Sequence, residues 1–345
     1  MSRNFKVGFF LVLAILTTTF TFYFWQLVKT PNFQVNKKTS FALYIPEGAT
    51  YDQVLDSLNR NDVVADQISF RFLAKFLDLP ENIKPGRYLL KPDMSNYEAV
   101  KKLTSGDQDP VKLTFNNIRL KQDLVSRIGS RFAFGEENFG KALSDPTLCA
   151  KYGFDTTTII SMFLPNTYDI FWTTGTEKFM DRMHSEYQKF WNPTRMAKAD
   201  SLGLTPIQVS ILASIVEEEQ ARKVDERPMV AGLYLNRLKA GMPLQADPTI
   251  KFALQDFAIK RILNDQLRVR SPYNTYVNTG LPPGPIRIAD LNSLNAVLDY
   301  KDHEYIYMCA KSDLSGYHAF AKTYAEHLKN AREYQTELNR LKIMK

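Results

Sequence analysis

The chain has 345 residues, of which 44% are hydrophobic and 23% are charged, and its formal net charge is +7. This composition excludes wholesale disorder and can supply the cores of two or three domains. The positive charges are spread along the sequence without an arginine-rich run, which argues against a nucleic-acid partner. Cys149 and Cys309 have no zinc-site spacing, and we expect two buried free thiols unless they meet and pair.

The first element is a predicted membrane helix. Residues 7–28 contain no charged residue and are long enough to cross a bilayer. Arg3 and Lys6 precede them, which predicts that residues 1–6 are cytoplasmic and that the rest is exported. A cleaved signal peptide would have a shorter apolar core and small residues at a cleavage site, whereas this stretch ends in bulky aromatics. We therefore expect an uncleaved, single-pass anchor in the cytoplasmic (inner) membrane.

A small α/β unit is predicted next, after a polar linker at residues 29–39. Its pattern alternates between short strands and amphipathic helices and ends near residue 109. Turn residues and helix caps separate these elements. The unit spans residues 40–109, with strands at 40–45 and 84–90 and helices at 50–61, 69–77 and 96–103.

Residues 110–345 are predicted to form a larger, mixed and helix-rich domain. Two strand patterns and five helical patterns occur in it, and Pro165 favours an extended loop at residues 163–168. The strands are expected at 111–115 and 305–310, and the helices at 121–131, 176–191, 206–220, 225–239 and 323–341. The fold class is therefore α+β, with a single N-terminal transmembrane helix, a small α/β subdomain and a larger domain.

The helix at 206–220 contains the most informative acid. Thr205 has the position of an N-cap, and the following apolar residues recur at helical spacing. By that spacing Glu219 lies near the middle of the apolar stripe, whereas Glu217 projects toward another side and Glu218 lies at the edge. Only Glu219 is therefore expected to point toward the core. The stripe consists of Val209, Leu212, Ile215 and Val216.

A carboxyl group held against apolar surface ionises less readily, so its pKa rises and it can donate a proton near neutral pH. A glycosidic general acid needs this property. The alternative is that the three consecutive acids mark the solvated end of the helix, as acidic runs usually do.

Further polar residues follow in contexts that favour a cleft. Asn236 could bind sugar hydroxyls or a backbone group, and Asp247 could simply cap the next helix. The stretches 271–276 and 280–286 are rigid and rich in turn formers, which suits either a carbohydrate platform or ordinary structural turns. His318 and His327 do not have the spacing of a zinc site, and no phosphate-binding glycine loop or Gly-x-Ser-x-Gly motif occurs. No metal or cofactor is expected.

Taken together, these motifs resemble a known family. Residues 213–219, ASIVEEE, resemble the ASIxExE signature of the endolytic murein transglycosylases (MltG, or YceG-like proteins). Residues 273–276 and 280–286 resemble that family's YNTY and GLPPGPI blocks. The resemblance covers nearly the whole chain and is loose between residues 130 and 200. Shorter matching blocks occur at 226–227, 235–238, 241–242, 244–245, 247–249, 316–320 and 323–327.

The resemblance implies a LysM-like unit at residues 40–109 and a catalytic domain at 110–345. It also implies that Glu219 is the catalytic acid/base, whereas Glu218 stands where the family is usually basic or variable. The implied reaction is non-hydrolytic cleavage of the MurNAc-β-1,4-GlcNAc bond of nascent peptidoglycan glycan strands, which gives 1,6-anhydro-MurNAc ends and terminates elongation. The candidates for substrate binding are Asn236, Gln245, Asp247, Tyr273, Asn274 and Tyr276.

Two alternatives remain. Asp247 could provide a second carboxylate, which would make the protein a hydrolytic muramidase. The chain could also be a non-catalytic, membrane-anchored scaffold that binds peptidoglycan. Peptidoglycan synthases (penicillin-binding proteins) are the expected neighbours in the membrane.

Overall fold

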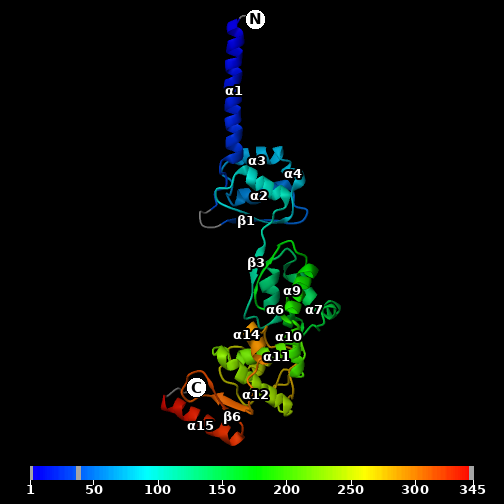
Figure 1. The fold of residues 1–345 in the computed structure, drawn as a ribbon, viewed down its shortest axis with the longest axis vertical. Helices are drawn as coiled ribbons and strands as arrows, with labels where there is room; N and C mark the ends of the chain where they lie inside the picture. The colour runs from blue at the N-terminus through cyan, green and yellow to red at the C-terminus, as the bar shows by residue number, and fades with distance from the viewer. Residues whose placement is uncertain (1–2, 36–39, 342–345) are drawn as a thin grey trace. The chain divides into compact units, whose positions relative to one another are not determined.

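The computed structural model describes residues 3–35 and 40–341, and it shows a helix-rich α+β protein (Figure 1). Residues 36–39 of the expected linker therefore lie outside the described residues, as do the two N-terminal and the four C-terminal residues. The chain divides into two compact units. The N-terminal unit comprises Met1–Leu113, Arg131–Phe134 and Tyr168–Gly175, and the C-terminal unit comprises Thr114–Ser130, Gly135–Thr167 and Thr176–Lys345.

The N-terminal unit begins with α1 (Arg3–Lys29), which contains the whole of the uncharged stretch. No residue of α1 is buried, and the helix is long and apolar enough to cross a membrane. In water, so much exposed apolar surface would be unfavourable, and a lipid bilayer is the environment that suits it.

Two strands and four helices follow α1 between residues 41 and 105. β1 pairs antiparallel with β2, with Phe41 opposite Leu90, and the buried side chains include Leu43, Phe70 and Tyr88. The helix at 69–77 begins two residues earlier than expected because the Asp66 carboxylate caps its N-terminus. The short helix α4 was not predicted. The bounds are β1 (Phe41–Ile45), α2 (Tyr51–Arg60), α3 (Gln67–Phe76), α4 (Leu79–Asn82), β2 (Gly86–Leu90) and α5 (Asn96–Ser105).

The segment expected as a linker is partly packed into this unit. Pro31 forms a β-bridge with Ser95, and Phe33 forms one with Val64. The Phe33 ring is 4% exposed and contacts the ring of Phe70 edge to face. This packing was not predicted, because one aromatic residue in a polar stretch has no periodicity. The described end of the segment therefore belongs to the fold of the unit.

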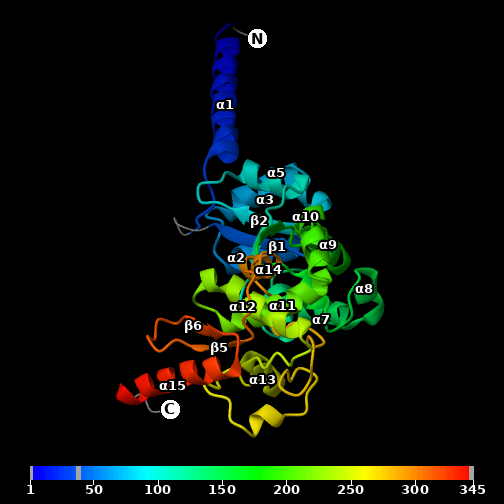
Figure 2. The same ribbon diagram turned by 60° about the horizontal axis from the view of Figure 1, so that its bottom comes forward.

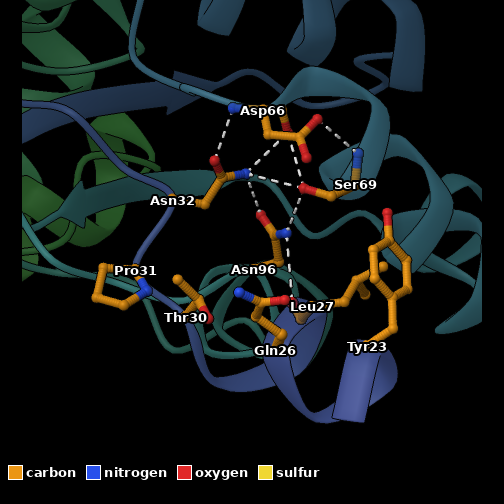
Figure 3. Close-up of a pocket in the computed structure, with 9 residues that line it drawn as sticks. All are labelled: Tyr23, Gln26, Leu27, Thr30, Pro31, Asn32, Asp66, Ser69 and Asn96. Carbon is orange, nitrogen blue, oxygen red and sulfur yellow. Dashed lines mark hydrogen bonds between the residues drawn. The ribbon is translucent and has the colours of Figure 1, made fainter. Parts of the chain in front are cut away.

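A polar network joins this segment to the end of α1 (Figure 3). The side chain of Asn32 donates to the side chain of Asn96 (2.7 Å) and to the backbone carbonyl of Asp66, and it accepts a hydrogen bond from the backbone N–H of Asp66. Asn96 in turn donates to the hydroxyl of Ser69 (3.0 Å) and, weakly, to the Leu27 carbonyl (3.5 Å) near the end of α1. These groups line a pocket of about 300 Å³. The network ties α1 to α3 and α5.

The C-terminal unit is built around α11, against which α12, α13 and α14 pack (Figure 2). Every helix and strand predicted for residues 110–345 is present within a few residues, and α7, α8, α10, α13, α14, β4 and β6 were not predicted. Cys149 is a buried free thiol and Cys309 is a partly buried one. The helices are α6 (Lys121–Gly129), α7 (Gly135–Ser144), α8 (Pro146–Lys151), α9 (Thr176–Phe190), α10 (Pro193–Ser201), α11 (Pro206–Glu219), α12 (Arg227–Lys239), α13 (Asp247–Leu254), α14 (Leu291–Leu298) and α15 (Tyr324–Arg340). The strands of this unit are β5 (Tyr307–Ala310) and β6 (His318–Ala321), which pair with each other. Two further strands, β3 (Val111–Thr114) and β4 (Thr167–Ile170), also pair with each other, and most of their residues belong to the N-terminal unit.

Candidate active site

Helix α11 positions the three consecutive acids. It starts with the expected capping box, in which Thr205 and Gln208 exchange hydrogen bonds with each other's backbone. All residues from Val209 to Glu217 are buried, so α11 has no single apolar stripe. The expectation that only Glu219 points toward the core was wrong, because Glu217 is 5% exposed.

Residues from a distant part of the sequence cause this burial. The segment 286–290 lies over the side of α11 that carries Ser214 and Glu217. The backbone N–H of Ile286 donates to the Ser214 hydroxyl (3.1 Å), and that of Asp290 donates to the Glu217 carboxylate (2.7 Å). A helical wheel considers only the residues of α11, so it cannot show that the segment 286–290 buries this side of the helix.

Glu217 and Glu218 are both held by arginines. Arg287 places one guanidinium nitrogen 2.8 Å from Glu217 and another 2.5 Å from Glu218. Arg119 forms two further hydrogen bonds with Glu218, at 2.9 and 3.0 Å. Burial raises the pKa of Glu217, and the Arg287 charge opposes that rise. These two acids therefore act as structural anchors for α11.

Glu219, at the end of α11, has a different environment. Its side chain is half-buried and accepts a hydrogen bond from the Tyr234 hydroxyl (3.1 Å). Loss of hydration and, secondly, the negative charge of Asp247 raise the pKa of Glu219 to about 7, against the opposing effects of Tyr234 and Lys251. The adjacent Glu218 adds the smallest upward contribution. Glu219 thus has the elevated pKa that the sequence led us to expect.

Tyr234 is a site residue that the sequence interpretation missed. It lies on α12, is 1% exposed and directs its hydroxyl at Glu219. A buried tyrosine usually finds a partner for its hydroxyl, so a tyrosine inside the apolar stretch of α12 was an available signal.

Asp247 and Tyr276 form the second part of the site. The Tyr276 hydroxyl donates to Asp247 at 2.5 Å, and burial together with this contact raises the pKa of Tyr276. Asp247 is exposed and lies in the first turn of α13, where a negative charge is favourable. Its charge acts on Glu219, so the structure brings Glu219, Tyr234, Asp247 and Tyr276 together.

Gln245 lies on the loop that leads into α13. It is exposed and has a φ of 52°, in the left-handed region. Arg237 fixes this loop by donating to the Leu244 carbonyl (2.8 Å) and to the Gln245 side chain (3.2 Å). Gln245 is therefore held two residues from Asp247 on a constrained loop.

Asn236, Asn274 and Tyr273 have the structural roles that the sequence left open as alternatives. Asn236 donates to the carbonyls of His303 and Tyr305, which are remote in sequence. Asn274 is fully buried, and its side-chain amide forms hydrogen bonds with three backbone groups, including the N–H of Tyr276. Tyr273 packs its ring against Phe252, with centroids 4.7 Å apart.

The loop at 280–286 is also tightly packed. A Cβ atom at Gly284 would lie 2.7 Å from Thr157 and 2.9 Å from the Tyr273 hydroxyl, so only glycine fits there without a shift. The loop and the turn at 271–276 therefore pack against each other through Tyr273 and Gly284. This packing supports the turn that carries Tyr276.

Comparison with known proteins gives a consistent family. Residues 43–333 match the model of the YceG-like family. A protein of Bacillus subtilis named endolytic murein transglycosylase is 29% identical, over 88% of this chain and 87% of that protein. One of the same name from Streptococcus pneumoniae (strain D39) is 26% identical over 96% of this chain, which spans 65% of its length. The crystal structure of a YceG-like protein from Listeria monocytogenes has a TM-score of 0.56 and 28% identity, over 85% of this chain and 99% of that one.

Proposed function

The chain belongs to the YceG-like family, and from this we propose that it is a membrane-anchored endolytic murein transglycosylase, a lyase. The observation that carries the proposal is Glu219, a half-buried carboxyl whose pKa of about 7 leaves much of it protonated at neutral pH. The relatives that are named endolytic murein transglycosylases support the substrate class.

In the proposed reaction, Glu219 is first the acid and then the base. Protonated Glu219 donates its proton to the glycosidic oxygen as the bond from that oxygen to C1 of N-acetylmuramic acid breaks. The resulting carboxylate accepts the proton of the C6 hydroxyl on the same sugar, while O6 bonds to C1. The products are a GlcNAc 4-hydroxyl and a 1,6-anhydro-MurNAc end, and no water is consumed.

The surrounding residues support this double role. Tyr234 holds the carboxyl of Glu219 in one position, and the charge of Asp247 favours its protonated form. Asp247 would also stabilise the positive charge that develops on the sugar as the bond breaks. Gln245 and Tyr276 are the remaining candidates for contacts with sugar hydroxyls. Since the attacking oxygen belongs to the substrate, no second carboxylate is needed as a nucleophile or to activate water.

The apolar helix α1 supports a position of the site near the cell wall. We propose that α1 is an uncleaved anchor with a cytoplasmic N-terminus, which puts the catalytic unit on the outer, periplasmic side. The small unit at 40–109 would be LysM-like and would hold glycan. Nascent strands would then be the substrate, and penicillin-binding proteins the neighbours that supply them.

Mass spectrometry of the strand ends tests the proposal. The full chain in detergent or vesicles is incubated with defined, uncrosslinked glycan strands. Anhydro-muramoyl ends are the expected result. Reducing ends would indicate a hydrolytic muramidase, with Asp247 activating water. Binding without any new ends would indicate a scaffold.

The pH dependence of cleavage provides a second prediction. Since Glu219 must be protonated to donate, the rate is expected to fall as pH rises through about 7. Asp247→Asn removes a charge that raises the pKa of Glu219, so the alkaline limb should move to lower pH. Tyr234→Phe removes a hydrogen bond that lowers this pKa, so the limb should move to higher pH. Rate profiles of the three proteins from pH 5 to 9 give the comparison, and shifts in the same direction would contradict it.

A further inference from the structure

Helix α3 has three distinct faces. Phe70, Leu73 and Ala74 are buried in the core of the N-terminal unit. A second face carries Arg71 and Lys75, which are exposed. The third face is apolar and exposed. It consists of Ile68 (83% exposed), Phe72 (54%) and Phe76 (61%).

The exposed apolar face is continuous by its spacing. Residues four apart lie above one another on a helix, so Ile68, Phe72 and Phe76 form one row. The rings of Phe72 and Phe76 stack, with centroids 6.3 Å apart. A soluble domain rarely leaves such a row in water, so this face is a surface for a partner.

The row adjoins the membrane helix. The ring of Phe76 contacts that of Phe24 on α1, with centroids 6.0 Å apart. Phe24 precedes Lys29, the basic end of α1, by five residues, which is about 7.5 Å along a helix. Phe76 therefore lies at the level of Phe24, inside the membrane boundary that Lys29 marks. This depth is within the roughly 5–10 Å to which interfacial helices bury their apolar faces.

The polar network fixes this level. Asn96 bonds both the Leu27 carbonyl near the end of α1 and Ser69 in the first turn of α3 (Figure 3). Asn32 and Asp66 complete the connection at the start of α3. Both ends of α3 are therefore attached to the last turns of α1, one through the network and the other through Phe76.

We propose that α3 is an interfacial helix, whose row of Ile68, Phe72 and Phe76 is inserted into the outer leaflet beside α1. Arg71 and Lys75 flank the row and reach anionic lipid headgroups, as basic residues of such helices do. The continuity of the row with Phe24 favours lipid over a sugar or a second copy of the chain. The N-terminal unit would then rest on the membrane with one fixed face instead of rotating about α1.

Fluorescence quenching in vesicles tests this orientation. Cys149 and Cys309 are replaced by alanine in the full chain, and one cysteine is introduced at position 72 and labelled with nitrobenzoxadiazole. The protein is reconstituted into vesicles of phosphatidylethanolamine and phosphatidylglycerol. Spin labels on the acyl chains are expected to quench the probe at position 72 several-fold more than one at position 71. Aqueous iodide should show the reverse order.

Position 71 is the matched control, because it lies on the same helix about 100° away. Equal quenching by iodide at both positions would overturn the proposal. So would emission at position 72 that changes with protein density, which indicates a second copy, or only with added glycan strands, which indicates a sugar platform. The inference rests on the proposed anchoring by α1, so a probe at Phe22 serves as a separate reference. Absence of lipid quenching at Phe22 would overturn the anchor and this proposal together.

Discussion

Glu219→Gln is expected to reduce the rate of glycan cleavage by at least about 10²- to 10⁴-fold, the usual contribution of a positioned proton-transfer group. Glutamine keeps the shape of the side chain and can still accept the hydrogen bond from Tyr234, but it can neither donate a proton to the leaving oxygen nor accept one from the 6-hydroxyl. Initial rates on defined strands, followed by chromatography of the products, give the comparison. The matched control is Glu333→Gln, which changes an exposed acid on α15 and should cleave like the wild type.

The stability of Glu219→Gln tests whether misfolding, and not the missing proton transfer, causes its loss of activity. The folded-state pKa of Glu219 is raised from an ordinary value of 4.5 to about 7. Such a group contributes full stability below pH 4.5, and this contribution is lost as pH rises toward about 7. The wild type should therefore lose stability relative to Glu219→Gln across that range. Melting curves at pH 4.5 and 8 measure this, and a variant that is less stable at pH 8 would mean that lost activity reflects damage to the fold.

Arg287→Ala is expected to have the largest effect on stability, about 3–5 kcal/mol, because it leaves two carboxylates without their shared partner in the interior. Arg287 and Glu217 each have side chains that are 7% exposed, and Arg287 also contacts Glu218. Glu218 keeps Arg119, whereas Glu217 keeps the backbone N–H of Asp290 and the charge of Arg227, which does not form a salt bridge with it. The unpaired charge of Glu217 is thus the main cost.

Chemical denaturation of the full chain measures this loss. Arg332→Ala is the matched control, since Arg332 is exposed on α15, and its effect should lie within about 0.5 kcal/mol. Glu217→Gln combined with Arg287→Met should recover part of the stability, because it removes the stranded charge. A loss for Arg287→Ala no larger than that for Arg332→Ala would show that the buried ion pairs do not hold α11 in place.

The elements that the sequence predicts well are those with local signals. The capping residues Thr50 and Thr205 mark the starts of α2 and α11, and periodic apolar residues define their course. The packed residues at 31–33 had no comparable signal, whereas α14 has an N-cap, Asp290, and apolar residues at helical spacing that the sequence interpretation missed. Asn32 and Phe33 are ordered by contacts with residues more than 30 positions away.

The site shows the same limit. The raised pKa of Glu219 agrees with its predicted environment, but the helical wheel that selected Glu219 directed Glu217 away from the core, where it is in fact buried. The side of α11 that carries Glu217 is buried by Arg287 and Asp290, about 70 residues further along the chain, and no property of α11 itself indicates them. From the sequence, Asn236 and Asn274 could each have either bound the substrate or stabilised the backbone. Only the folded structure shows that the side-chain amides of Asn236 and Asn274 donate to backbone carbonyls.

Infrared difference spectroscopy of the membrane-reconstituted protein tests most directly whether the reactive carboxyl still carries its hydrogen at neutral pH. The spectrum of Glu219→Gln is subtracted from that of the wild type at each pH. A carbonyl band of a neutral carboxylic acid should remain and should disappear with a midpoint near pH 7. Disappearance of that band with a midpoint near 4.5 would show an ordinary, ionised glutamate and would contradict the proposed acid.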